Sequence, residues 1–257
     1  MKASESNEIR QQPIISVRKV SKKFRFWDDR PTSFKTVLVN ALYGNFEFGS
    51  KREFDALRDI TFDIYPGEFV GIMGRNGAGK STLMKLLAGI YQPTSGEIGV
   101  NGQIAPLIEL GAGFHPELSG YENIFLNAAV LGFGRAATEE ALPEILEFAE
   151  LGEKIHMPIK NYSSGMLVRL GFSVATHLTA PIVLIDEILA VGDLAFQQKC
   201  IQKVHELNKE GKTIVLITHS PSSVAEHCSR CIVIDQTEKV FDGAALEGSD
   251  FYKRLFP

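Results

Sequence analysis

The chain has 257 residues, and 44% of them are hydrophobic, which is enough for a globular protein with a sizeable core and excludes a disordered chain. Its formal charge of −4 disfavours nucleic acid as a partner, because a nucleic-acid-binding domain usually carries a basic surplus. Three cysteines cannot build a disulfide framework, so a reducing cytosol is expected.

Short apolar segments alternate with longer segments of helical period, an arrangement that predicts an α/β fold with a largely parallel sheet. The predicted strands are residues 15–17, 69–73, 182–185, 214–218 and 232–234. Residues 1–13 are polar and are predicted to be a disordered tail, so that the globular part spans 14–257. No apolar run approaches the roughly 20 residues of a membrane span, so action at a membrane would require another subunit.

Residues 31–54 form an insertion between the first two predicted strands. Thr32 or Ser33 can cap a short helix in it, and Gly44 can end that helix. The apolar residues at helical spacing are Phe34, Val37, Leu38, Ala41 and Leu42. Such a stripe packs on the protein's own core or, next to the basic cluster of residues 16–35, on a membrane partner or lipid surface.

A complete phosphate-binding loop follows the strand at 69–73 and opens an apolar helix at 83–87. Its glycines let successive backbone N–H groups surround phosphates, and the helix N-terminus adds a positive dipole end. Lys80 would then reach the β- and γ-phosphates, and Ser81 would ligate Mg²⁺. The residues of the loop are Gly74, Arg75, Asn76, Gly77, Ala78, Gly79, Lys80, Ser81 and Thr82. The chain is therefore predicted to bind a nucleoside triphosphate.

Residues 115–180 contain no clear strand and are predicted to be a helical subdomain inserted into the sheet domain. Thr138 is a candidate cap of one of its helices, and Pro181 ends the helical run.

Two later strands deliver polar side chains to the edge of the sheet. The apolar residues 182–185 lead directly to Asp186 and Glu187, and a second buried strand ends at His219. Asp186 would belong to the Mg²⁺ shell, Glu187 would activate the attacking water as general base, and His219 could reach a γ-phosphate.

His227, Cys228 and Cys231 resemble half of a zinc site. A zinc site needs a fourth ligand, however, and Cys231 opens the apolar strand 232–234, so a structural role is expected.

The segment from Tyr162 to Met166 begins a long predicted helix, and here the chain resembles the ATP-binding subunits of ABC transporters. In that family a Leu-Ser-Gly-Gly-Gln signature at this place faces the γ-phosphate held by the opposite subunit. Ser163 and Gly165 match it. The variant, with Ser164 between them, is similar to that of the subfamily exporting O-antigen, capsule and teichoic-acid polysaccharides. Residues 110–116, the D-loop residues 190–193 and the insertion are also similar, so that the resemblance spans about 14–243.

This resemblance implies the roles of several further residues. Asp193 would belong to the D-loop, Phe24 would stack on adenine, and His219 would be the switch histidine. Glu109 is the candidate for the family's magnesium-sensing glutamine, because no glutamine lies there. Ser163, Ser164 and Gly165 would act in trans, so the family pattern implies a homodimer holding ATP and Mg²⁺ at its interface.

We expect an ABC-type P-loop ATPase with an inserted helical subdomain. The resemblance implies that it works with a separate multi-span membrane permease at the cytoplasmic face of the inner membrane and exports a lipid-linked polysaccharide. One alternative is a soluble ATPase of the DNA-repair type, but residues 102–180 leave no room for a coiled coil. Another alternative is a regulatory nucleotide-binding module, which would tolerate loss of Glu187.

Overall fold

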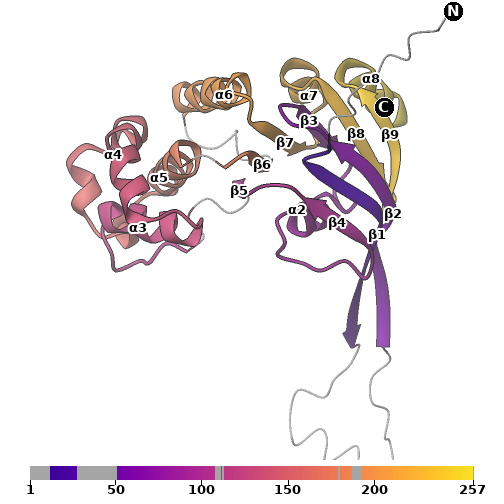
Figure 1. Cartoon of the computed structure of the whole chain (residues 1–257), viewed down its shortest axis with the longest axis horizontal. Helices are drawn as coiled ribbons and strands as arrows, with labels where there is room; N and C mark the ends of the chain where they lie inside the picture. The colour runs from indigo at the N-terminus through magenta and orange to yellow at the C-terminus, as the bar shows by residue number, and fades with distance from the viewer. Residues whose placement is uncertain are drawn as a thin grey trace, which may run out of the picture.

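The structure is a computed structural model that describes residues 12–27, 51–107, 111, 113–178, 180–186 and 193–256. Its central sheet has the strand order β5-β6-β7-β3-β8-β9 (Figure 1). The parallel strands are β3 (Phe69–Met73), β5 (Ile104–Leu107), β6 (Ile182–Asp186), β7 (Thr213–Thr218) and β8 (Arg230–Asp235), and β9 (Glu238–Ala244) is antiparallel. Every residue of β3 and β7 is buried, as expected for parallel strands covered on both faces.

A second, antiparallel sheet has the order β2-β1-β4, with β1 (Ile15–Trp27), β2 (Lys51–Ile64) and β4 (Ser95–Val100). The five predicted strands are present, but β1 is much longer than residues 15–17, and β2, β4, β5 and β9 were not predicted. Polar and glycine residues interrupt the apolar pattern of β2, β4 and β9, and β5 is only four residues long and contains Pro106. Residues 51–54 of the predicted insertion belong to β2, and its helix at 32–44 lies outside the described residues.

Helix α2 (Lys80–Leu87) lies between the two sheets. Its buried residues Leu83, Met84, Leu86 and Leu87 share one core with side chains from β1, β2 and the inner face of the central sheet. The opposite face of the central sheet is covered by α6 (Leu194–Lys209), and α7 (Pro221–His227) and α8 (Ala245–Leu255) pack near β8. The start of α2 is therefore held rigidly between two layers of strands.

The described part of residues 115–180 forms a separate group of helices (Figure 1). It consists of α3 (Gly120–Val130), α4 (Arg135–Ala149), the short 3-10 helices η1 (Gly152–His156) and η2 (Ile159–Asn161), and α5 (Ser164–His177). Ser119 caps α3 in a capping box with Glu122, whose pKa is lowered by hydrogen bonds from the Ser119 side chain and backbone.

The expectation that Thr138 caps a helix is wrong. Gly134 is the N-cap of α4, and Thr138 lies inside the helix, where its hydroxyl donates a hydrogen bond of 3.0 Å to the carbonyl of Gly134. Among the helices that the structure describes, none has the length and apolar character needed to cross a membrane.

Candidate nucleotide-binding site

The phosphate-binding loop connects β3 to α2. Gly77 and Gly79 have φ angles of 84° and 105°, a region that side chains other than glycine rarely adopt. The Nζ atom of Lys80 donates hydrogen bonds of 2.7 Å to the carbonyl of Gly74 and 3.0 Å to that of Arg75. The loop thus curls around the ammonium group that is expected to hold phosphate.

Two glycines of the loop are required by close packing. A Cβ atom on Gly74 would collide with the carbonyl oxygen of Ile234 in β8, and one on Gly79 would collide with that of Ala56 in β2. Because backbone atoms cannot move away cheaply, both positions exclude side chains. The loop is therefore a preformed cradle of backbone groups at a helix N-terminus, the geometry that binds phosphate.

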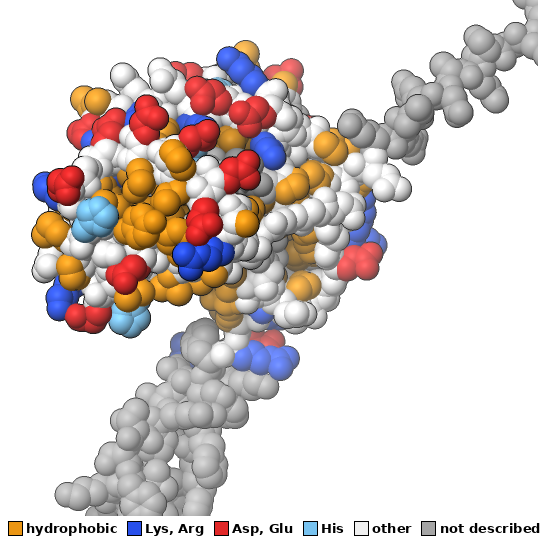
Figure 2. All heavy atoms as spheres, turned by 60° about the vertical axis from the view of Figure 1, so that its left-hand side comes forward, with side chains coloured by type: hydrophobic (Ala, Val, Ile, Leu, Met, Phe, Trp, Pro, Cys, Tyr) orange, Lys and Arg blue, Asp and Glu red, His pale blue; other side chains and the backbone are white. Residues whose placement is uncertain are grey.

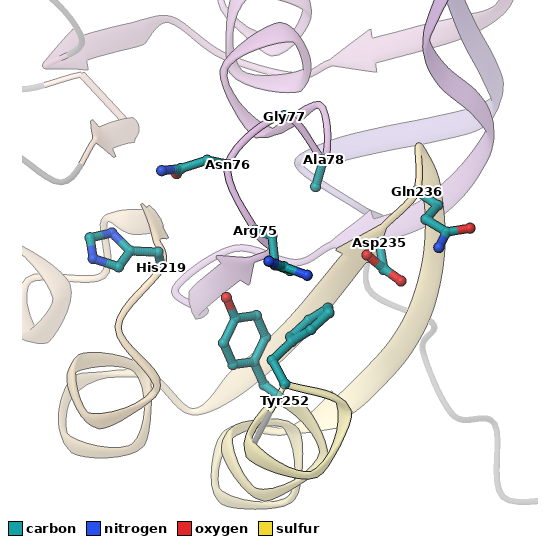
Figure 3. A pocket seen from close by; sticks show the side chains of 9 residues that line it. Arg75, Asn76, Gly77, Ala78, His219, Asp235, Gln236 and Tyr252 are labelled. Carbon is teal, nitrogen blue, oxygen red and sulfur yellow. The ribbon is translucent and has the colours of Figure 1, made fainter.

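His219 reaches the same loop. A cavity of about 500 Å³ is lined by residues 75–78 on one side and by His219 on another (Figure 3). Asp235, Gln236, Tyr252 and Phe256 complete the cavity. These four residues were not predicted, because no motif in the sequence shows that the end of β8 and the C-terminal helix lie near the loop. The guanidinium of Arg75 lies 5.2 Å from the ring centre of Phe256.

Asp186 is the last residue of β6 and is half-buried. In the central sheet β7 lies between β6 and β3, and the three strands are parallel. The loop after β3, Asp186 at the end of β6 and His219 after β7 therefore meet at one edge of the sheet. This is the edge where open α/β sheets bind nucleotides. Glu187, the predicted base, lies outside the described residues.

Phe24 and Phe54 are aromatic residues of the neighbouring strands β1 and β2. Phe24 is half-buried on β1, with its ring 5.5 Å from and edge-on to Tyr91. Phe54, directly opposite Phe24 on β2, is 51% exposed and lines a second cavity of about 250 Å³. That cavity is also lined by Lys80, Ser81 and Thr82. Phe54 was not predicted as a site residue, because only the register of β1 and β2 brings it to the loop.

The signature residues begin α5 in the helical group. Ser163 is the N-cap, and its hydroxyl accepts a hydrogen bond of 3.3 Å from the N–H of Met166. Ser164 is the first helical residue, and Gly165 has almost nothing beside it where a Cβ would lie. Tyr162, which replaces the family's leucine, is buried and donates a hydrogen bond of 2.7 Å to the carbonyl of Lys154.

Asp193 is the N-cap of α6. Its pKa is held below the ordinary value by a hydrogen bond from the backbone N–H of Phe196 and by contact with Arg169. The other predicted D-loop residues, 190–192, lie outside the described residues. So does Glu109, the candidate for the magnesium-sensing glutamine.

The cysteines lie in packed surroundings. Cys231 is buried in β8, and burial raises the pKa of Cys228 and of Cys231 to about 12. His227 contacts His205, with 3.2 Å between Nδ1 and Nε2. Among the described residues, histidine, cysteine and acidic side chains form no group of three that could hold a metal ion.

Comparisons with known proteins agree with this site. Residues 57–190 match the family model described as ABC transporter. The chain is 41% identical over 243 residues to an O-antigen export system ATP-binding protein, RfbB, of Klebsiella pneumoniae, covering 95% of this chain and 98% of that protein. It is 39% identical over 238 residues to the teichoic acids export ATP-binding protein TagH of Listeria monocytogenes, covering 93% of this chain and 69% of that protein.

Solved structures show the same fold. A dimeric ATP-binding cassette in a post-hydrolysis state with ADP and phosphate superposes with a TM-score of 0.70 at 22% identity, covering 90% of this chain and 98% of that chain. The ATP-binding subunit of an ABC transporter gives a TM-score of 0.72 at 23% identity, covering 94% of this chain and 93% of that chain. The predicted P-loop α/β fold is thereby confirmed. The family match and the sequence relatives of the chain, together with the phosphate-binding loop and His219, show that it belongs to the ABC transporter family and is an ATP-binding ATPase.

Proposed function

We propose that the protein is the motor subunit of an exporter for a lipid-linked polysaccharide. In this proposal two copies hold ATP between them at the cytoplasmic face of the inner membrane and drive a separate membrane permease. The observation that carries the ATPase part is the cavity that His219 lines together with residues 75–78 of the phosphate-binding loop. The polysaccharide part rests on similarity to O-antigen and teichoic-acid export proteins along most of the chain.

The residues present fit ATP with Mg²⁺. Backbone packing keeps side chains out of the cradle at Gly74 and Gly79, and Ser81 and Asp186 supply a hydroxyl and a carboxylate, the hard oxygen ligands that Mg²⁺ prefers. Magnesium held by these two residues would supply positive charge beside the β- and γ-phosphates.

Side chains of the protein carry out the other steps of ATP binding and hydrolysis. Lys80 exchanges its hydrogen bonds with Gly74 and Arg75 for phosphate oxygens, and His219 donates a hydrogen bond to the γ-phosphate. Glu187 accepts a proton from the attacking water. An aromatic ring of the β1–β2 pair stacks on the base.

A second copy completes the site. The described residues that line the two cavities at the loop come from β2, β8, α2, α8 and the adjoining loops, and α5 contributes none. The start of α5 therefore lines neither of these two cavities. We assign Ser163, Ser164 and Gly165 to the ATP bound by the partner copy, where the N-terminus of α5 would favour the γ-phosphate.

The permease would dock on the helical group. Figure 2 shows hydrophobic side chains gathered on this face and surrounded by acidic and basic ones. Val130 at the end of α3 is 62% exposed, and Met157 is 41% exposed. Large exposed apolar groups with a charged rim are typical of interaction sites.

The proposal is tested by purifying the chain alone and with the membrane subunit of its exporter and measuring ATP turnover and glycan transport in vesicles. We expect slow turnover alone, faster turnover in the complex, and transport that requires Lys80. Lys80→Ala is the control for both activities. Turnover that the membrane subunit does not change would favour a soluble ATPase, and ATP binding without any turnover would favour a regulatory module.

A further inference from the structure

Arg169 connects the signature helix to the start of α6. It lies on α5, and its side chain is 19% exposed. Its Nη2 atom donates a hydrogen bond of 2.7 Å to Oδ2 of Asp193, and its guanidinium lies 4.4 Å from the ring centre of Phe196. Phe196 is 1% exposed, so the guanidinium rests on a fixed surface of the core.

The carboxylate of Asp193 accepts hydrogen bonds from two helices. Its Oδ1 atom accepts a hydrogen bond of 2.9 Å from the backbone N–H of Phe196 and so caps α6, while Oδ2 accepts the bond from Arg169. A movement of α5 therefore acts directly on the first turn of α6.

The other side of Arg169 is fixed by α4. Its Nη1 atom donates a hydrogen bond of 2.8 Å to Oε2 of Glu150, the C-cap of α4, which adopts a left-handed conformation with φ of 54°. Oε1 of Glu150 accepts a 2.6 Å bond from Lys199 of α6. Lys199 also lies 4.5 Å from the ring centre of Phe148. The group of Arg169, Glu150, Asp193 and Lys199, called here the Arg169 cluster, joins three helices.

We propose that Arg169 is a positioning residue that holds the start of α5 and Asp193 in one fixed arrangement for the partner copy. The inference rests on the proposed homodimer, in which the start of α5 acts on ATP bound by the other subunit, and it extends that role to Asp193 beside it. A planar guanidinium bonds two carboxylates through two nitrogens held at a fixed distance, whereas a lysine offers a single, freely rotating ammonium group. Without it, two carboxylates would remain near each other with one cation fewer between them.

Apolar burial holds α5 and α6 in place independently of this cluster. Leu170, Phe172 and Val174 bury α5 in two hydrophobic cores, and Phe196 and Cys200 bury α6. We therefore expect Arg169→Ala to fold and to bind nucleotide at its own loop. Its ATP-dependent dimerisation and turnover should fall by roughly tenfold or more, the scale for losing hydrogen bonds between charged groups.

The test places the same two substitutions in different arrangements, using full-length chains with two distinguishable tags. Mixed dimers of Arg169→Ala with Lys80→Ala keep one intact site, made of the loop of the first chain and the signature of the second. Mixed dimers of wild type with an Arg169→Ala/Lys80→Ala chain keep none. We expect the first kind of mixed dimer to turn over ATP at nearly the rate of a mixed dimer of wild type with Lys80→Ala. The second kind should show little turnover.

Each result decides a separate point. Equal turnover in the two mixtures would overturn the role of Arg169 in trans. Absence of turnover in the control dimer of wild type with Lys80→Ala would mean that one intact site is insufficient for hydrolysis. In that case ATP-driven dimerisation is measured for the same pairs of chains instead. Dimerisation of Arg169→Ala with wild-type ATP dependence would also overturn the inference, while failure of wild type to dimerise would count against the proposed function itself.

Arg169→Lys separates positioning from charge. It keeps the cation but lacks the two guanidinium nitrogens that fix Glu150 and Asp193 at a set distance, so we expect the ATP affinity of the isolated chain to stay within about twofold and kcat to fall. Full activity of Arg169→Lys would show that charge alone suffices and would overturn the positioning role.

Discussion

Phe24 and Phe54 lie directly opposite each other on the antiparallel strands β1 and β2. Opposed residues of such strands point to the same face, so both rings lie on the same side of this sheet. Phe54 lines the cavity at Lys80 and Ser81, while Phe24 packs edge-on against Tyr91. The Nζ atom of Lys22 lies 5.2 Å from the ring centre of Phe24 and 5.4 Å from that of Tyr91.

Replacing Phe24 by Ala should weaken ATP binding by about 1–3 kcal/mol if its ring stacks on adenine. Phe24→Tyr should be nearly silent, because it keeps the stacking face. Titration of each variant with ATP measures the effect. Wild-type affinity in Phe24→Ala would assign that ring to the core.

Phe54→Ala distinguishes the two rings. We expect it to weaken ATP binding by a smaller amount than Phe24→Ala, because Phe54 shields one edge of the cavity while remaining 51% exposed. Phe54→Leu is the matched control, since it keeps apolar bulk without an aromatic face. A larger loss in Phe54→Ala than in Phe24→Ala would identify Phe54 as the stacking residue.

Glu187→Gln should keep ATP binding and lose turnover by about 10²-fold or more, because the amide cannot accept the proton of the attacking water. The variant should also form a stable dimer with ATP and Mg²⁺, which a sizing column detects. Turnover within about threefold of the parent would contradict the assignment of Glu187 as base, and a protein that stays monomeric would contradict the shared site.

The Arg169 cluster should make stability depend on pH. Hydrogen bonds from Lys199 and then Arg169 hold the pKa of Glu150 below its ordinary value of 4.5. As the pH falls, the carboxylate of Glu150 therefore becomes protonated in the unfolded chain before it does in the folded chain. The stabilisation is complete at pH 7. It is lost below about pH 4.5, as the pH falls through the pKa of the folded state.

Melting temperatures of wild type and Glu150→Gln, measured from pH 7 to 3.5, check this expectation. The difference should be largest at neutral pH and should shrink in acid. Glu140→Gln, at an exposed carboxylate of the same helix, is the control and should show little difference. A Glu150→Gln difference that grows as the pH falls would have the wrong sign.

Leu38→Glu should uncouple ATP hydrolysis from export if the stripe of residues 34–42 meets the permease or the lipid surface. The stripe lies outside the described residues, and its role rests on its spacing alone. ATPase activity and surface glycan are scored separately in the whole transporter. Asn40→Glu adds the same charge off the stripe and should leave export intact. Normal export with Leu38→Glu would contradict the prediction, and loss of folding would place the stripe in the core.

The sequence alone determined the parts of the protein whose chemistry is local. The loop from Gly74 to Thr82 needs glycines, a lysine and a hydroxyl residue at fixed spacing, and the buried strands before it, before Asp186 and before His219 are continuous apolar runs. These features are visible without any long-range contact.

The tertiary structure decided which distant residues meet. Phe54 reaches the loop through the register of β1 and β2, Tyr252 and Phe256 reach it because α8 packs near β8, and Arg169 meets Glu150 and Asp193 where three helices converge. Register and packing depend on the burial of whole surfaces, so a short stretch of sequence carries little information about them. For the same reason the partly exposed strand β2, which presents Phe54, was not predicted.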